Sequence, residues 1–453
     1  MDPLFYSIDI FLFIKKGKYN VVSINDIALY LKTGFAAGKN DQELETDGII
    51  QLRPTNMNEQ GLLIFDKNIE LPKELLNLKK DDLLQKDEIL FNNTNSQELV
   101  GKSAFFNLDG NYFCSNHVTR IKVKKESINP KYLWILLNLY QKQKVFFNLC
   151  TNWNNQSGVN IELLKTIQIP LPPLDIQQKI VSIMDNAYKT KKDKEIEAES
   201  LLNSIDDYVL DELGIKIPEI TKKMCFKVNL EDIRGGRIDN EYHQPKFRYY
   251  FENIKKSKYS IENLNKIVEF IENGRTPPKE CYIDNKKGLP IIKVAGASKK
   301  IIDLNKLEYF KKDFKPSKSV KKGDIFILAA AHQADYIGKN ISILDDEPKE
   351  NIYYVGELIN IRTNKECNNY YLYSFLSTNF MFHLINREKR GQTSHLYPDD
   401  LKTLPIPIPP LDIQQKIANE VKNRMDTAKN LKKEAKEGLE KAKREIEKII
   451  FEE

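Results

Sequence analysis

The sequence predicts an α+β protein in which two similar mixed α/β domains alternate with two long helices. We expect these helices to pair as an antiparallel coiled coil with pseudo-two-fold symmetry. The main observation is a segment that occurs twice, as LKTIQIPLPPLDIQQKI at Leu164–Ile180 and as LKTLPIPIPPLDIQQKI at Leu401–Ile417, with 14 identical positions. Each copy ends a segment of globular composition and begins a long, charged helical pattern. An internal repeat of this size indicates one structural unit used twice.

The repeat divides the chain into five segments. We expect a first domain at 1–173, a first helix at 174–213, a linker at 214–225, a second domain at 226–410 and a second helix at 411–453. Gly214 and Pro218 follow the first helical pattern and are typical signals for the end of a helix. Inside the two domains, Lys86–Phe91 and Gly323–Leu328 each resemble an acidic turn that leads into a β-strand.

Both helical patterns carry an apolar seam. Apolar residues recur at steps of three and four, which indicates heptad-like packing. At 1.5 Å per residue each helix is about 60 Å long and cannot bury this stripe alone, so the simplest partner for each helix is the other. The alternative is a structural stalk or an oligomerisation coil. The residues that we expect in the seam and in partner docking are Ile180, Met184, Leu202, Ile205, Val209, Ile417, Val421, Leu439 and Ile446.

Composition narrows the class of protein. Hydrophobic residues make up 41% and charged residues 30%, as in a soluble globular protein with solvated helices. No apolar run approaches the roughly 18 residues of a membrane span, and the N-terminal region does not resemble a signal peptide. We therefore expect a cytoplasmic protein without membrane contact. The cysteines are odd in number and never in C-x-x-C spacing, which predicts reduced thiols and no structural metal site.

Charge points to a polyanionic partner. The net charge is +6, whereas the first helix carries 5 Lys and 10 acidic residues and the second carries 11 basic and 10 acidic residues. The basic surplus therefore lies on the globular segments, as expected for contacts with phosphates. A protein with two similar, basic surfaces suits duplex DNA. The alternative is an ordinary lysine-rich surface.

The repeated motif resembles a known signature. Ile169–Ile180 and Ile406–Ile417 resemble the iPlPPLxxQxxI signature of the specificity (S) subunits of type I restriction–modification systems. Gly391-Gln-Thr-Ser394 and, more loosely, Gln156-Ser-Gly158 resemble the turn that precedes it. Arg237–Tyr242 is similar to the family's RLDxEYY motif, whereas the first domain has only Met1–Tyr6, so this motif is degenerate or truncated there. The resemblance covers essentially the whole chain.

The resemblance implies a non-catalytic adapter. In this family two target recognition domains each read one half of a split sequence in double-stranded DNA, and the helices dock two methyltransferase (M) subunits. Restriction (R) subunits join in the full complex. S-adenosylmethionine and ATP belong to those partners, so no cofactor or metal is expected here. The alternatives are the specificity subunit of a related type II system with a fused nuclease–methyltransferase, and a coiled-coil scaffold with duplicated protein-binding heads.

Motifs of catalysis are not found in the sequence. An adenine methyltransferase needs Asn or Asp before Pro-Pro, and no Pro-Pro pair here has one. Gly101-Lys102-Ser103 ends like a P-loop, but Ser96 replaces its first glycine. Scattered acidic residues leave a metal nuclease as a minor alternative.

Polar loops supply the candidates for DNA contact, because base edges and phosphates need donors and acceptors. The alternative for each is a solvated turn. In the first domain they are Lys32, Thr33, Lys39, Arg53, Thr55, Asn56, Asn92, Asn93, Thr94, Asn116 and His117. In the second domain they are Arg275, Thr276, Lys279, His332, Gln333, Lys389, Arg390, Gln392, Thr393, Ser394 and His395. Trp134 and Trp153 are expected to pack in cores.

Overall fold

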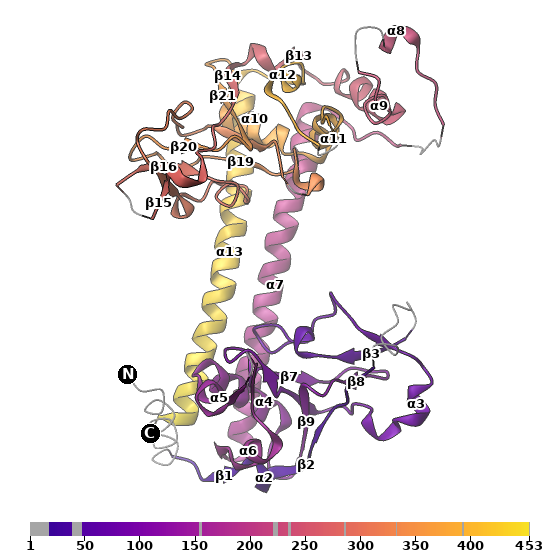
Figure 1. The fold of residues 1–453 in the computed structure, drawn as a ribbon, viewed down its shortest axis with the longest axis vertical. Helices are drawn as coiled ribbons and strands as arrows, with labels where there is room; N and C mark the ends of the chain where they lie inside the picture. Colours follow the sequence, from indigo (N-terminus) through magenta and orange to yellow (C-terminus); the bar gives the residue numbers. More distant parts are fainter. Residues whose placement is uncertain are drawn as a thin grey trace. The chain divides into compact units, whose positions relative to one another are not determined.

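The computed structural model describes two compact units (Figure 1). Unit 1 comprises Met1–Glu195 with Lys432–Glu453, and unit 2 comprises Ile196–Leu431. Each unit contains part of both long helices, so the limits of the predicted segments stay a prediction. The described residues are 18–38, 48–153, 156–220, 225–233, 237–284, 287–331, 333–391 and 394–452.

Unit 1 is built on an antiparallel sheet of four strands in the order β2-β9-β5-β7. A second sheet, β4-β3-β8, joins β3 and β8 in parallel, and a third has the order β10-β11-β6. The strands are β1 (Val21–Ser23), β2 (Ala28–Thr33), β3 (Ile49–Leu52), β4 (Glu70–Leu71), β5 (Glu88–Asn92), β6 (Thr94–Asn95), β7 (Ser103–Phe106), β8 (Phe113–Cys114), β9 (Val118–Val123), β10 (Thr151–Trp153), β11 (Gln156–Gly158) and β12 (Gln168–Pro170). The helices are α2 (Ile24–Ile27), α3 (Leu75–Leu78), α4 (Pro130–Lys142), α5 (Val145–Leu149) and α6 (Ile161–Thr166), with 3-10 turns η2 (Pro54–Asn56) and η3 (Lys80–Asp82).

Helix α4 packs on the main sheet of unit 1. Asn129 caps it by accepting the N–H of Lys131, and Pro130 occupies the first turn, where a missing N–H costs nothing. Its residues Tyr132–Leu137 are buried. Trp134 stacks on Tyr188 at 5.8 Å, which confirms its expected place in the core.

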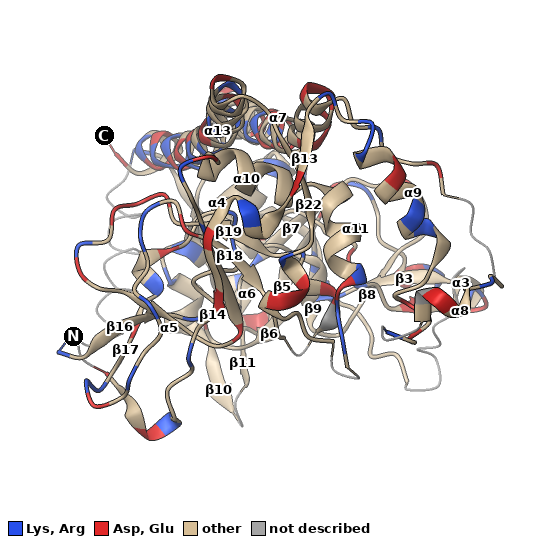
Figure 2. Ribbon diagram, turned by 90° about the horizontal axis from the view of Figure 1, so that it is seen from above, with Lys and Arg blue, Asp and Glu red and all other residues tan. Residues whose placement is uncertain are grey.

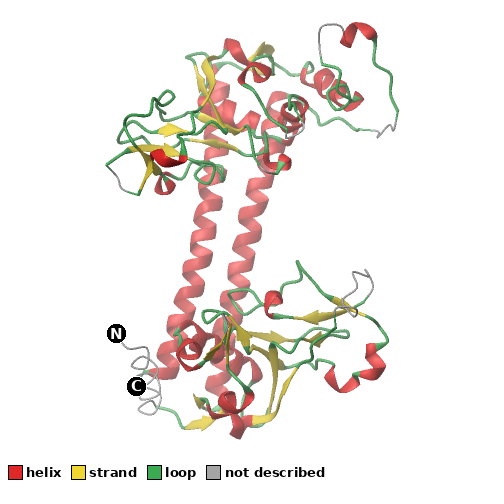
Figure 3. Cartoon of the chain, viewed as in Figure 1, coloured by secondary structure: helices red, strands yellow, loops and turns green. Residues whose placement is uncertain are grey.

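Unit 2 repeats this plan. Its main sheet has the order β14-β21-β18-β19, and a second has the order β15-β17-β16-β20, in which β16 and β20 are parallel. The strands are β13 (Ser260–Asn263), β14 (Val268–Asn273), β15 (Tyr282–Ile283), β16 (Leu289–Ile292), β17 (Glu308–Phe310), β18 (Ile325–Leu328), β19 (Ile341–Ile343), β20 (Tyr353–Tyr354), β21 (Leu358–Thr363) and β22 (Pro405–Ile408). The helices are α8 (Leu230–Ile233), α9 (Pro245–Ile254), α10 (Asn369–Leu376), α11 (Asn379–Arg387) and α12 (Pro398–Leu401), with 3-10 turns η4 (Leu264–Lys266), η5 (Lys279–Cys281), η6 (Leu304–Lys306) and η7 (Ala334–Tyr336). Figure 3 shows the mixture of helix and strand in both units.

The prediction of two long helices is confirmed: α7 spans Leu174–Leu213 and α13 spans Leu411–Phe451. In unit 2, Lys416 lies 2.8 Å from Glu212, and the guanidinium of Arg424 donates to the carbonyl of Ser204 at 2.9 Å. Residue numbers fall along α7 as they rise along α13, so the helices run antiparallel within this unit. In unit 1, Lys194 of α7 pairs with Glu434 of α13 at 2.6 Å.

The helix seam is buried within each unit. Of the nine expected seam residues only Leu202 is half-buried, and the other eight are buried. Leu439 and Ile446 join the core of unit 1, whereas Ile417 and Val421 join that of unit 2. Among the described residues, no helix combines the length and the apolarity needed to cross a bilayer.

Candidate nucleic-acid interface

The repeated segment forms a joint between the sheet and the long helix. In unit 1 the backbone N–H of Asn129 donates to Oε1 of Gln177 at 2.7 Å. Nε2 of Gln177 donates to the carbonyl of Pro172 at 2.8 Å. The side chain of Asn129 donates to Oε1 of Gln178 at 3.1 Å. The two glutamines therefore lock the start of α7 to the cap of α4.

The same joint is present in unit 2. The N–H of Asn368 donates to Oε1 of Gln414 at 2.7 Å, and Nε2 of Gln414 donates to the carbonyl of Pro409 at 2.9 Å. The side chain of Asn368 donates to Oε1 of Gln415 at 2.9 Å. The motif is thus a structural device that fixes the direction in which each helix leaves its sheet.

A glycine ends the first strand of each main sheet. A Cβ on Gly34 would lie 2.1 Å from the carbonyl oxygen of Cys114, and one on Gly274 would lie 2.2 Å from that of Tyr354. Only glycine allows this approach of two backbones. Thr33 directly precedes the glycine in unit 1, and Arg275 directly follows it in unit 2, so candidate residues lie beside equivalent strand ends.

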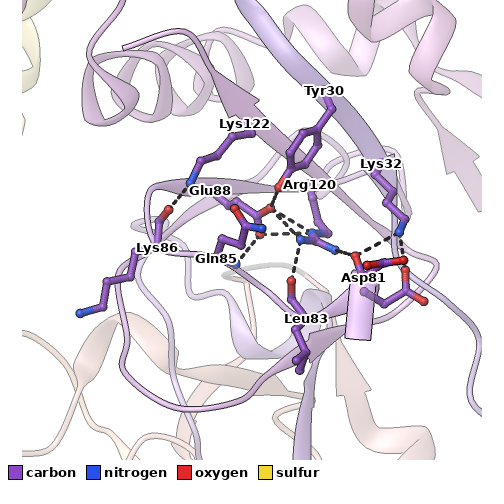
Figure 4. Close-up of polar contacts among 10 residues, drawn as sticks. Tyr30, Lys32, Asp81, Leu83, Gln85, Lys86, Glu88, Arg120 and Lys122 are labelled. Atoms are coloured by element: carbon purple, nitrogen blue, oxygen red, sulfur yellow. Dashed lines mark hydrogen bonds and ion pairs between the residues drawn. The ribbon is translucent and has the colours of Figure 1, made fainter. Parts of the chain in front are cut away.

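A buried ion pair supports this edge in unit 1 (Figure 4). Arg120 is 2% and Glu88 is 0% exposed, and the guanidinium donates to the carboxylate at 2.8 Å and to the carbonyl of Leu83 at 2.7 Å. Tyr30 also donates to Glu88. Burial, together with the adjacent carboxylate, raises the pKa of Tyr30 to about 12. Figure 4 also shows that the ammonium of Lys32 donates to the backbone carbonyl of Asp81. The same ammonium forms an ion pair with Asp82 at 2.7 Å.

Unit 2 has a similar ion pair. Its acidic residue lies at the same strand position as in unit 1, but its arginine lies at a different one. Asp324 occupies the place of Glu88, and Arg362 donates to both of its oxygens at 2.7 Å. Strand pairing sets Ile361 opposite Ile325 and Ile121 opposite Ile89, so Arg362 corresponds to Lys122 and Asn360 corresponds to Arg120. Both main sheets therefore contain an arginine–carboxylate ion pair, although the arginine lies at a different strand position in each.

A hollow of about 590 Å³ opens in unit 1. It brings together the predicted candidates Thr33, Asn93, Thr94 and Asn116. Other lining residues come from the hairpin of β10 and β11 and from the start of α6; they are Thr151, Trp153, Gly158, Val159, Asn160, Ile161 and Glu162, with Thr119 from β9.

Two hollows among the described residues of unit 2 gather further candidates. One, of about 860 Å³, gathers the candidates Lys389, Arg390 and Ser394 with Arg237 and Arg387. Arg237 is held there by the carbonyl of Glu388 at 3.1 Å. The other, of about 530 Å³, is lined by Arg275 together with Asn273, Lys315 and Ser317.

Several candidates of the first domain have internal roles. Asn56 and Asn92 are buried and donate to the carbonyls of Ile64 and Leu99, at 3.1 and 2.8 Å. We therefore no longer expect them to contact DNA; such amides hold loops because buried backbone carbonyls need donors. Asn93 also donates inward, to Thr119 at 2.9 Å. Burial lowers the pKa of Arg53. Thr55 and Asn116 are exposed, His117 is half-buried, and Lys39 lies outside the described residues.

In the second domain more of the candidates for DNA contact are exposed. Arg275, Lys279, Gln333 and Arg390 are exposed. Thr276 is exposed, and its hydroxyl donates a hydrogen bond to the carboxylate of Glu357 at 2.7 Å. His395 is half-buried and exchanges backbone hydrogen bonds with Arg390 at 2.7 and 2.8 Å. His332, Gln392 and Thr393 lie outside the described residues.

Trp153 is not in a core, contrary to the sequence-based prediction. It is 47% exposed at the end of β10. Residue type alone suggested burial, whereas the hairpin turns the ring toward the hollow. The sequence-based selection also missed Asn160 and Arg237, although both are polar residues close to quoted motifs.

Charges of both signs alternate along α7 and α13 (Figure 2). The helices are therefore not the basic surface of the protein, in agreement with the charge count. Within the described ranges no cluster of three or more His, Cys, Asp or Glu side chains is placed to hold a metal ion.

A family model decides the assignment. The model for the type I restriction modification DNA specificity domain matches twice, at residues 16–200 and 256–441. The chain belongs to this family. The two matches include most of the chain, and the same two copies carry the repeated helix joint.

Individual relatives agree with the family model. The type I restriction enzyme MjaVIII specificity subunit of Methanocaldococcus jannaschii is 25% identical over 443 residues, with 96% of this chain and 92% of that protein covered. A second protein of that organism, named provisionally as the MjaX specificity subunit, is 26% identical and covers 86% and 84%. A chain from a solved type I R-M system structure on complex assembly has a TM-score of 0.52 at 16% identity, covers 96% and 97%, and shares the fold.

Proposed function

We propose that this chain is the DNA-sequence specificity subunit of a type I restriction–modification complex. Each unit reads one half of a bipartite target, and the paired helices dock methyltransferase subunits. The observation that carries the proposal is the double family match, because each copy comprises a sheet unit and the beginning of a long helix. A protein with a single DNA-reading domain would need one sheet–helix joint. This chain has two, one at Gln177 in unit 1 and one at Gln414 in unit 2.

DNA contact is assigned to the hollows of the two units. Thr33 and Asn116 in unit 1 and Arg275 and Arg390 in unit 2 lie there and offer donors and acceptors. Phosphate contacts from lysines and arginines release counterions, so affinity should fall steeply as salt rises. Base contacts in the grooves then supply the sequence preference.

The helices supply the docking platform for two methyltransferase subunits, with restriction subunits added in the full complex. Their inner faces are buried in each unit, whereas their outer faces are charged and exposed. The names of the two relatives described above, both specificity subunits of type I restriction enzymes, support this role.

In this proposal the chain is an adapter without catalysis, and S-adenosylmethionine and ATP bind only to partners. The sequence supports it through the missing methyltransferase and P-loop motifs. The specificity subunit of a type II system remains the second candidate because it requires the same fold; the two differ in whether the nuclease is fused to the methyltransferase.

The test is modified-base sequencing of host DNA with the gene intact and with the gene deleted. We expect one bipartite motif to lose its methylation on deletion and to regain it when the gene is restored. An unchanged set of methylated motifs, with the methyltransferase subunit expressed and active alongside another specificity subunit, would support the scaffold alternative instead.

A further inference from the structure

Two hairpin stems occupy equivalent places in the units. In unit 1, β10 and β11 pair Trp153 with Gln156 and Thr151 with Gly158. In unit 2, Arg390 and His395 form an antiparallel bridge. Each stem follows a helix of its unit, α5 or α11, and precedes α6 or α12, which leads into the repeated segment. The offset of the repeated segment sets His395 at the place of Gly158, and strand pairing then sets Arg390 at the place of Thr151. Trp153 lies two residues further along the same first strand of the stem.

The ring of Trp153 is held in a defined position. A Cβ on Gly158 would lie 2.5 Å from a ring carbon of Trp153, so the ring rests against the glycine across the stem. Gly158 pairs in turn with Thr94 of β6, which anchors the stem to the body of the unit. The exposed part of the ring is therefore presented without a large loss of conformational freedom on binding.

The described surroundings of Trp153 carry no basic side chain. Its hollow is lined by hydroxyl and amide side chains, including Thr33, Thr94, Asn116 and Asn160, and Glu162 is the only charged side chain among the described lining residues. Amides pair with the N6 and N7 edge of adenine, and apolar groups contact the methyl group of thymine. This hollow suits A·T pairs better than guanine, which is read most often by arginine or lysine.

Arg390, on the first strand of the stem in unit 2, offers a charged donor instead. Its side chain is 51% exposed and forms an ion pair with Asp400, whose side chain is 4% exposed. Its guanidinium also lies 5.9 Å from the ring of Tyr397. The buried carboxylate fixes one edge of the guanidinium, while the exposed part lines the hollow with Arg387 and Ser394. An arginine oriented in this way can donate twice to O6 and N7 of guanine.

We propose that the first strand of this stem determines specificity in both units: Arg390 reads a guanine in one half-site, and Trp153 contacts an A·T pair in the other. The proposal rests on the function proposed above and deepens it, because it assigns different base chemistry to the same stem in the two units.

The test uses the complex of the full chain with its methyltransferase subunit, limiting enzyme and a library of randomised target sites, read by modified-base sequencing. Arg390→Lys keeps a positive charge beside Asp400 but cannot form the bidentate pair of hydrogen bonds that a guanidinium can form. We expect it to reduce the preference for one guanine by about tenfold while the other half-site is unchanged. Trp153→Ala should reduce the preference for one A·T pair by about fivefold or more, in the opposite half.

Controls separate these effects from general damage. Arg248→Ala and Leu78→Ala alter exposed side chains outside the hollows and should leave every position of the motif unchanged. If the Arg390→Lys variant does not assemble with the methyltransferase subunit, the double variant Arg390→Gln with Asp400→Asn removes both charges of the ion pair. It should show the same reduced preference for guanine at that position of the motif.

The outcomes keep the two proposals apart. Wild-type complex without sequence-specific methylation would refute the proposed function. Wild-type methylation of a bipartite motif, with position preferences unaltered in both variants or altered in the same half-site, would overturn this inference and leave the proposed function standing.

Discussion

The backbone N–H of Asn129 donates to the side-chain oxygen of Gln177 at 2.7 Å, across 48 residues of sequence. Gln177 is fully buried and uses its amide nitrogen for the carbonyl of Pro172. One side chain thus satisfies a helix cap and a proline-rich turn at once. The same arrangement around Gln414 shows why the repeated motif requires a glutamine here.

Replacing Gln177 by Leu should destabilise unit 1. The change leaves the N–H of Asn129 and the carbonyl of Pro172 without partners, and each unmet buried group costs about 1–3 kcal/mol. Lys179→Ala, at an exposed position of the same helix turn and outside the joint, is the control and should cost less. Chemical denaturation measures both variants; equal stability of Gln177→Leu and wild type would show that the joint does not hold the helix.

Loss of Arg120 should be among the most damaging single changes in unit 1. Arg120→Leu leaves the buried carboxylate of Glu88 unpaired, which costs about 3–5 kcal/mol. Lys125→Ala removes an exposed pair with Asp87 and should change the free energy of unfolding by less than about 1 kcal/mol. The prediction fails if urea denaturation finds the two variants equally stable.

Glu440 should make the stability of unit 1 depend on pH. Hydrogen bonds from Lys142 at 2.6 Å, and then from Lys443 at 3.0 Å, lower its pKa to about 2 from an ordinary value of 4.5. Because the folded-state pKa is the lower one, this stabilisation is complete above the ordinary value and is lost as pH falls from there toward 2.

Melting temperatures of wild type and Glu440→Gln test this dependence. The wild type should melt higher at pH 7, and the difference should shrink steadily as pH is lowered to 3. Glu437→Gln, at an exposed position of the same helix, serves as the control. A difference that does not vary with pH would assign the effect to packing and not to ionisation.

DNA binding should depend on the basic edge of unit 2. Arg275, Lys279 and Arg390 are exposed, and each is expected to contribute about 1–3 kcal/mol if it reads a base. We expect the triple alanine variant, in complex with its methyltransferase subunit, to bind target DNA far more weakly and with a smaller salt dependence. Fluorescence anisotropy titrations at two salt concentrations measure this; affinity equal to that of wild type would reject the assignment.

Periodicity and repetition in the sequence predicted the two long helices, their apolar seam and the reuse of one fold. The role of Gln177 was not predictable in this way, since its partner Asn129 is distant in sequence. Asn56 and Asn92 look like solvated loop residues until strand pairing shows which carbonyls they satisfy. Trp153 was assigned to a core by residue type, whereas the pairing of β10 with β11 exposes it.

The central claim is that each recognition domain reads one half-site independently. Its most direct test replaces residues 226–400 by the equivalent residues of a relative with a different target and maps methylated bases in the host. The account predicts a new motif in which only one half-site has changed. A change in both halves, with the variant complex folded and active, would contradict it.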